Sequence, residues 1–166
     1  MRFELDYQFL RDSGLLLNAE DLRLGVSLGL ISPPVAIAIA TDAVNTGDRD
    51  PSMVGLDLLD RDDVAGVCAT LRAVDPADAE LFPPSSVRKF TYLQLKAAFE
   101  LRDRLTDPLG VVEQVYADFD YPASVAAFVR YMPPPPDADV GEQALYERWA
   151  QYLAGEDAAL RSESKG

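Results

Sequence analysis

Histidine is absent from the 166-residue chain, and cysteine occurs once. Without histidine there is no Ser-His or Cys-His pair, no imidazole general base and no histidine-containing zinc site. Cys68 cannot form a disulfide within the chain, and its apolar surroundings from Val64 to Ala69 predict a buried structural thiol. A single cysteine is typical of a reducing compartment, so we predict a cytoplasmic protein. We expect neither enzymatic activity nor a bound cofactor or metal.

Long apolar runs are also missing. The longest, from Pro33 to Ala40, is much shorter than the roughly 18–20 residues that cross a bilayer. The first residues do not show a basic segment followed by an apolar one, so we expect no secretory signal. Together these features predict a protein that does not act at a membrane.

Positive charge is scarce, because 15 Lys and Arg side chains stand against 28 Asp and Glu, for a net charge of −13. A field of this sign repels nucleic acid, so we predict no nucleic-acid partner. The one basic stretch, residues 88–105, contains Arg88, Lys89, Lys96, Arg102 and Arg104. We interpret these as surface charges that balance the acids. The overall field favours a basic protein partner, with solubility alone as the alternative explanation.

Apolar residues make up 48% of the chain, and signals for the start of a helix recur. The signals are a capping residue or an X-Pro pair before an apolar stretch. They occur at Asn18, Ser32-Pro33, Asp50-Pro51, Arg61-Asp62-Asp63 and Asp107-Pro108. We therefore predict an all-α fold, a compact orthogonal bundle of about seven to nine short helices. Residues 1–155 would form a single domain and residues 156–166 a flexible tail. A minor N-terminal hairpin, and a buried strand over Ile31–Thr41, remain alternatives.

Three segments of the second half are distinctive. The spacing of apolar residues predicts a long helix from about Pro84 to Leu105, apolar over a wide arc. The stretch from Pro133 to Asp139 cannot be helical and predicts a stiff polyproline II strut. A last helix, from about Gly141 to Leu153, would dock through Trp149, which we interpret as a packing anchor.

Acidic residues are dense between positions 42 and 63. The seven are Asp42, Asp48, Asp50, Asp57, Asp60, Asp62 and Asp63. One hypothesis is that this patch, above all Asp57, Asp60, Asp62 and Asp63, binds a basic protein through electrostatic steering. The other interpretation is a solvated loop whose aspartates cap helices.

Two aromatic motifs carry a resemblance. They are Tyr-Ala-Asp-Phe-Asp-Tyr-Pro at residues 116–122 and Phe-Val-Arg-Tyr-Met-Pro at residues 128–133. With Trp149 and the Ser32 and Asp107 segments, they resemble a bacterial family known only as a domain of unknown function. The resemblance implies no activity and no catalytic residues. By analogy, small stand-alone families of this kind occur among immunity proteins, which would make the partner a basic bacterial toxin.

The first motif predicts a corner between two helices. We expect Asp118 and Asp120 to cap backbone N–H groups there, and Pro122 to start the next helix. Phe119, Tyr121, Phe128 and Tyr131 would cluster, and Arg130 would pair with one of the two aspartates. As a binding site, the corner would use Asp118, Asp120, Tyr121, Arg130 and Tyr131. The alternative is a metal-assisted hydrolase or transferase, in which the Asp-x-Asp pair holds Mg²⁺ or Mn²⁺.

Overall fold

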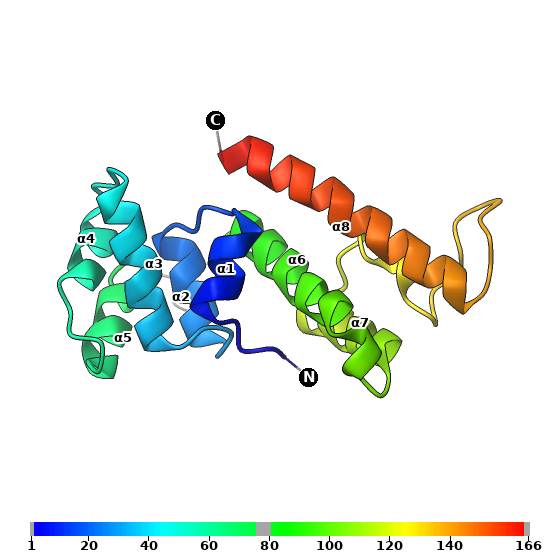
Figure 1. Cartoon of the computed structure of the whole chain (residues 1–166), viewed down its shortest axis with the longest axis horizontal. Coiled ribbons are helices and arrows are strands. Elements are labelled where there is room, and N and C mark those ends of the chain that lie inside the picture. The colour runs from blue at the N-terminus through cyan, green and yellow to red at the C-terminus, as the bar shows by residue number, and fades with distance from the viewer. Residues whose placement is uncertain (1, 76–80, 165–166) are drawn as a thin grey trace. The chain divides into compact units, whose positions relative to one another are not determined.

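The computed structural model describes residues 2–75 and 81–164, and all regular structure within them is helical. These residues form the α-helices α1 to α8 and two short 3-10 helices, without a strand (Figure 1). The all-α prediction and its helix count are confirmed. The N-terminal hairpin is wrong, because Tyr7–Ser13 form helix α1. Asp6 caps this helix by accepting a hydrogen bond from the Phe9 N–H at 2.7 Å.

The five predicted helix starts are confirmed. They precede α2 (Ala19–Ser27), α3 (Pro33–Asn45), α4 (Pro51–Asp57), α5 (Val64–Arg72) and α7 (Pro108–Asp118). Asn18 and Asp21 form a reciprocal capping box at α2, and Asp50, Asp63 and Asp107 each accept from backbone N–H groups. Ser32 occupies the cap position of α3 but makes no side-chain cap bond. Because α3 covers Pro33–Asn45, the strand alternative for this region is wrong.

The chain divides into two compact units. The N-terminal unit is Glu4–Arg88, and the C-terminal unit is Lys89–Gly166 together with Met1–Phe3. Helix α6 (Pro84–Glu100) contributes residues to both. The single domain over residues 1–155 stays a prediction.

Within the N-terminal unit, α3 packs against α4 and α5, and α5 also packs against α2 (Figure 1). Its core is aliphatic, and Leu22, Leu24 and Leu56 are fully buried. Burial of such side chains contributes about 1.5–3 kcal/mol each before entropic costs. Cys68 is half-buried rather than buried as predicted, and it lines a surface cleft with Arg72.

The long helix α6 is shorter than predicted. Helix α6 ends at Glu100, and the predicted last turn is the 3-10 helix η1 (Arg102–Arg104). The Arg104 N–H bonds to the Leu101 carbonyl three residues back, the tighter pattern common at helix ends. The wide buried arc is confirmed, since Phe90 and the residues from Tyr92 to Leu95 are buried.

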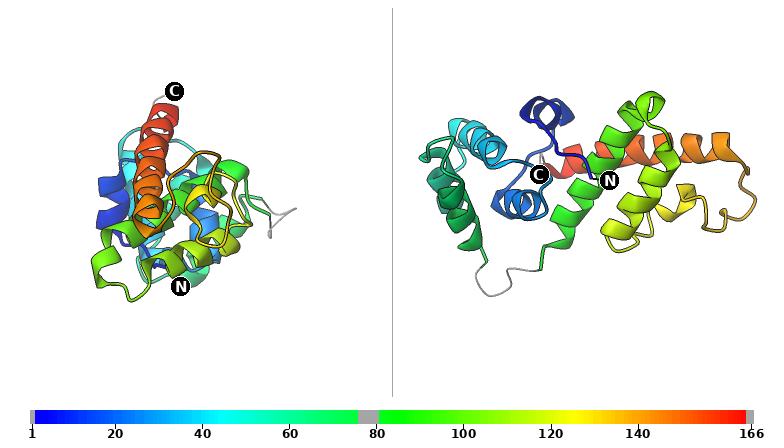
Figure 2. Two further views of the ribbon diagram at one scale, coloured as in Figure 1. Left: turned by 90° about the vertical axis from the view of Figure 1, so that its right-hand side faces the viewer. Right: turned by 90° about the horizontal axis from the view of Figure 1, so that it is seen from below.

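The last helix is longer than predicted. Helix α8 runs from Glu142 to Ser164 as one continuous ribbon, rather than ending near Leu153 (Figure 2). Leu160 is buried, and Arg161 pairs with Asp157 one turn earlier at 2.8 Å, so apolar burial and an ion pair both continue past the predicted end. The flexibility of residues 156–166 stays a prediction, and residues 165–166 lie outside the described residues.

The proline-rich connection is non-helical, as predicted, but it is not a straight strut. The chain turns where the Ala138 N–H bonds to the Pro135 carbonyl at 3.1 Å, and Asp137 takes a left-handed conformation with φ 60°. The 3-10 helix η2 (Ala126–Phe128) precedes this connection and packs against α8. None of the helices in residues 2–75 and 81–164 combines the length and apolar character needed to cross a membrane.

Candidate functional site

The elbow, residues 116–122, forms where helix α7 ends. The Tyr121 N–H donates to the Tyr116 carbonyl at 2.8 Å, and the Asp120 N–H donates to the Ala117 carbonyl at 3.3 Å. These two bonds are the Schellman arrangement, which satisfies the last carbonyls of a helix and needs a left-handed residue after it. Asp120 has φ 62°, and Tyr121 follows with φ 56°. Two consecutive left-handed residues with side chains cost about 1–3 kcal/mol each, so packing must hold them.

Several expectations for the elbow are wrong. Pro122 does not begin a helix, and the chain makes turns until η2 at Ala126. Asp118 does not cap the turn; it accepts hydrogen bonds from Arg2 at 3.2 Å and from Gln114 at 3.1 Å.

Tyr116 is the centre around which the elbow packs. It is buried, and the ring of Tyr121 meets it edge-on at a centroid distance of 5.2 Å. The ring of Tyr131 lies 6.2 Å from it. Tyr121 and Tyr131 are nevertheless each 58% exposed. The predicted four-ring cluster is therefore wrong, because Phe128 packs instead against Trp149 and Tyr152.

Arg130 is held by two acids from helix α7 and its cap, not by Asp118 or Asp120. It donates to both oxygens of Asp107 at 3.1 and 3.0 Å and to those of Glu113 at 2.7 and 3.2 Å. These bonds raise the pKa of Arg130, and they hold the pKa of Asp107 below its ordinary value together with the Gly110 N–H. The expectation that Arg130 pairs with Asp118 or Asp120 is wrong, because the carboxylates that accept its hydrogen bonds are those of Asp107 and Glu113.

The metal alternative finds no support in this geometry. Asp118 is engaged by Arg2 and Gln114, and Asp120 is exposed on the left-handed turn that follows. Within the part of the chain that the structure describes, no three side chains of His, Cys, Asp or Glu gather as a metal site would require.

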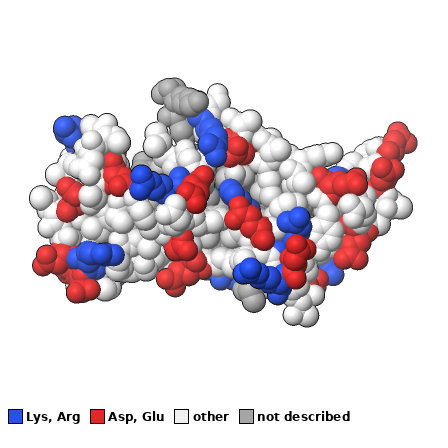
Figure 3. All heavy atoms as spheres, in the orientation of Figure 1, with Lys and Arg blue, Asp and Glu red and all other residues white. Residues whose placement is uncertain are grey.

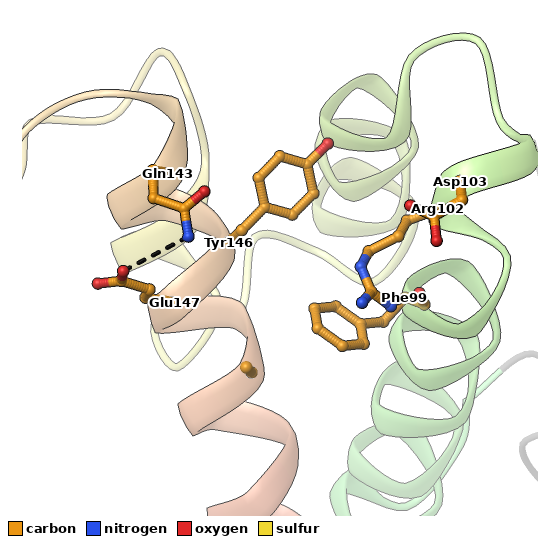
Figure 4. Close-up of a pocket in the computed structure, with 7 residues that line it drawn as sticks. Phe99, Arg102, Asp103, Gln143, Tyr146 and Glu147 are labelled. Atoms are coloured by element: carbon orange, nitrogen blue, oxygen red, sulfur yellow. Dashed lines mark hydrogen bonds between the residues drawn. The ribbon is translucent and has the colours of Figure 1, made fainter.

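A cleft of about 510 Å³ lies between the end of α6 with η1 and the first turns of α8 (Figure 4). Phe99, Arg102 and Asp103 form one wall. The facing wall is one face of α8, made by Gln143, Tyr146, Glu147 and Ala150. Arg102 stacks over the Phe99 ring at 4.0 Å and donates to the Phe99 carbonyl at 2.7 Å, so its guanidinium is held in place.

Tyr146 lines the cleft and also feels the charges of the Arg130 cluster. Burial raises the pKa of its hydroxyl, and the charges of Glu142 and Asp107 raise it further, whereas Arg102 and Arg130 lower it. The charges that act on Tyr146 thus come from both places. The pKa of the Tyr131 hydroxyl is also raised, first by desolvation and then by its neighbours Tyr116, Tyr121 and Glu113. We call Tyr121, Tyr131 and Tyr146, together with Arg130, the tyrosine strip.

Trp149 packs against Tyr146 and is fully buried, as predicted for a packing anchor. The Phe99 ring meets it edge-on at 5.0 Å, and the rings of Tyr146 and Phe128 stack on it at 5.9 and 6.3 Å. Its indole N–H is without a hydrogen-bond partner in the described residues. Tyr146 therefore rests on an aromatic core, which restricts its ring in advance of any binding.

The acidic residues 42–63 are mostly engaged in local structure. Asp50 and Asp63 cap helices, Asp57 accepts from Thr41 at 2.7 Å, and Asp42 accepts from the Tyr7 hydroxyl. Asp60 and Asp62 are exposed. Over the N-terminal unit, the face seen in Figure 3 shows acidic side chains interspersed with basic ones. The binding role of Asp57, Asp60, Asp62 and Asp63 stays a prediction.

One comparison with known proteins gives a match. The model of family DUF2247, described as an uncharacterised protein conserved in bacteria, matches residues 7–157. The chain belongs to this family. The elbow, the cleft and Trp149 of this DUF2247 chain all lie inside the matched residues. No curated protein and no solved structure matches the chain.

Sequence reasoning missed several residues of the DUF2247 surface. Tyr116 was part of the motif, but its role as the buried centre depends on the unusual turn. Asp107 was recognised as a cap and Glu113 not at all, since their contact with Arg130 spans 23 and 17 residues. The spacing of Gln143, Tyr146, Glu147 and Ala150 places them on one helix face, and this signal was available.

Proposed function

We propose that this DUF2247 chain is a protein-binding domain of the bacterial cytoplasm and that the tyrosine strip is its docking surface. The observation that carries the proposal is the pair Tyr121 and Tyr131, each 58% exposed although both pack on the buried Tyr116. Exposed tyrosines and arginines on a rigid base are the residue types that dominate binding energy in protein interfaces. The fixed ring positions reduce the entropy lost on binding.

The charge of the chain supports a basic partner. Asp107 and Glu113 contact Arg130 of the strip, and Asp120 directly precedes Tyr121, within a chain of net charge −13. Charges at the rim of an interface raise the association rate and exclude partners of the same sign. A basic bacterial toxin fits this description, and the chain would then act as its immunity protein. The single cysteine agrees with a reducing compartment.

The test is direct binding to the product of a basic toxin gene next to the gene for this chain. Titration calorimetry would compare the wild type with Tyr121→Ala and Tyr131→Ala. We expect each variant to lose about 2 kcal/mol or more of binding free energy, roughly 30-fold in affinity, as interface hot spots do. The matched control is Val140→Ala, because Val140 is 77% exposed in the same unit but outside the strip.

Two further measurements, a survival assay and the salt dependence of association, test the immunity role and the electrostatic steering separately. Cells that produce the toxin should survive when they carry the wild type or Val140→Ala, and should die with the double tyrosine variant. Raising the salt concentration should slow association without abolishing binding, because steering is screened and aromatic contact is not. Tight binding that ignores both tyrosine variants would exclude the strip as the docking surface, and absence of protection would exclude the immunity role.

A further inference from the structure

A second surface, in the N-terminal unit, is unlike the tyrosine strip. It is a groove of about 200 Å³ between the segment that follows α1 and one face of α3. Most of its lining is apolar, with Leu10, Leu15, Leu17, Ile39 and Ala43 as the main contributors. Arg11 and Asp42 are the charged side chains of the lining. The volume is too small for a typical small-molecule ligand and suits one or two apolar side chains.

The turn after α1 explains why Leu16 is exposed. Gly14 has φ 71° and ends α1, and three leucines follow it. Leu15 and Leu17 turn inward and are buried, at 8% and 7% exposure, whereas Leu16 between them is 64% exposed. An extended backbone alternates its side chains in this way. The large apolar side chain of Leu16 is therefore exposed to solvent at the edge of an apolar groove.

The charge of the surrounding segments indicates the kind of occupant. Residues 6–18 and 33–48, which frame the groove, carry four acidic side chains and one basic one. Asp42 lies in the lining itself and accepts a hydrogen bond from the Tyr7 hydroxyl, which also accepts from Arg11. An apolar groove within acidic segments is complementary to a helix that has apolar residues on one face and basic residues on the others.

We propose that the groove beside Leu16 binds a basic amphipathic helix of a partner protein. An apolar side chain of that helix would enter the groove and cover Leu16, and its lysines or arginines would face the acids of α1 and α3. The groove and the tyrosine strip are different surfaces. Either binding role can therefore be disproved without affecting the other.

The probe is a labelled synthetic helix with leucines on one face and lysines on the others, followed by fluorescence anisotropy against the full chain. A second peptide keeps the lysines and replaces the leucines with serines. We expect the leucine peptide to bind at least about tenfold more tightly than the serine peptide, since burial of one or two leucines is worth at least that factor.

The decisive comparison uses two exposed leucines of the same unit. Leu16→Ser removes the apolar edge of the groove, and Leu58→Ser removes a leucine that is 79% exposed and not part of the lining. We expect Leu16→Ser to weaken binding of the leucine peptide about tenfold and Leu58→Ser to change it less than twofold. Ala43→Phe, which fills the groove, should weaken binding as Leu16→Ser does. Tyr131→Ala should leave this peptide's affinity unchanged.

Each remaining outcome overturns the proposal. Equal binding of the two peptides would mean simple charge attraction. Equal effects of Leu16→Ser and Leu58→Ser would mean a non-specific apolar contact. Self-association of the chain in sedimentation, abolished by Leu16→Ser, would place a second copy in the groove instead. Circular dichroism of every variant checks that the helical content is retained.

Discussion

The two units begin a helix with the same device and use it differently. In the N-terminal unit, Asp63 caps α5 by accepting from the Gly66 N–H at 2.8 Å. In the C-terminal unit, Asp107 caps α7 by accepting from the Gly110 N–H at 3.1 Å. In addition, Asp107 holds Arg130 through both of its oxygens. A residue with a local capping role can therefore also make a long-range contact, and here that contact holds the chain beyond the elbow.

The two units also differ in what they bury. The buried apolar residues of the N-terminal unit, as far as the structure describes it, are aliphatic. The C-terminal unit buries aromatic rings, among them Phe90, Tyr92, Phe128 and Trp149. Rings pack in a few defined geometries and aliphatic chains in many. An aromatic core is therefore suited to holding a surface such as the tyrosine strip in one arrangement.

The largest effect is expected from breaking the aromatic core. Trp149→Ala should lower the free energy of unfolding by about 3–5 kcal/mol, because a fully buried tryptophan leaves a large cavity. Trp149→Phe should cost less than Trp149→Ala, since it keeps a ring and removes an indole N–H that has no partner in the described residues. Chemical denaturation followed by circular dichroism gives both values.

The control for Trp149→Ala is Leu22→Ala in the aliphatic core, with an expected cost of about 2–5 kcal/mol. Native-state hydrogen exchange should separate the two variants. Trp149→Ala should speed exchange of α7 and α8 amides more than that of α2 and α3 amides, and Leu22→Ala the reverse. Uniform acceleration in both variants would show that the two cores unfold as one.

The second comparison is between the two capping aspartates. Asp63→Ala should cost about 1 kcal/mol, the usual value of a lost helix cap. Asp107→Ala should cost more than Asp63→Ala, because it removes the cap and also one of the two carboxylates that hold Arg130. Thermal unfolding of both variants measures the difference. Equal costs would mean that the contact with Arg130 adds nothing to stability.

Local features of this fold could be predicted from the sequence, whereas long-range contacts could not. Caps join a side chain to a backbone group three residues away, so Asn18, Asp50, Asp63 and Asp107 were readable as helix starts. The partners of Arg130 were not readable, because nothing local distinguishes Asp107 and Glu113 from Asp118 and Asp120. The sequence indicates a corner at the elbow but not its left-handed backbone, because a Schellman end normally signals itself with glycine. Here Asp120 occupies that place.

The glycines of the two capping segments offer a finer comparison. A Cβ added at Gly66 would lie 2.4 Å from the Asp63 carboxylate, and one at Gly110 would lie 2.3 Å from that of Asp107. In Gly66→Ala, Asp63 can rotate away, and the helix propensity gained with alanine offsets the lost cap, so stability should change by less than about 0.5 kcal/mol. In Gly110→Ala, Arg130 restrains Asp107, and we expect a loss of about 1 kcal/mol. Similar melting temperatures for the two variants would contradict the restraint.

A smaller effect of opposite sign is expected at the elbow. Asp120→Gly should raise the free energy of unfolding by up to about 1 kcal/mol, because glycine adopts the left-handed conformation without strain. The matched change Asp118→Gly, at the last residue of α7, should lower stability instead, since it loses helix propensity and the contact with Arg2. Destabilisation by Asp120→Gly would mean that the aspartate side chain, and not the backbone, holds the turn.

The smallest expected effect is on the stability of the chain at low pH, through the carboxylate of Asp107. Asp107 has a lowered pKa in the folded chain, first because of its hydrogen bonds from Arg130 and then because of the Gly110 N–H. Its contribution to stability is therefore complete above its ordinary pKa, near 4, and is lost as the pH falls through the lower folded value. Arg130→Met should move the pKa of Asp107 upward, though not fully, because the Gly110 N–H remains. Carboxyl NMR titration measures this shift. Asp157 is the internal control, because its pKa is lowered mainly by Arg161 and should not move. If Arg130→Met left the titration of Asp107 in place, the cap alone would account for the lowered pKa, and the difference between the two units would reduce to their cores.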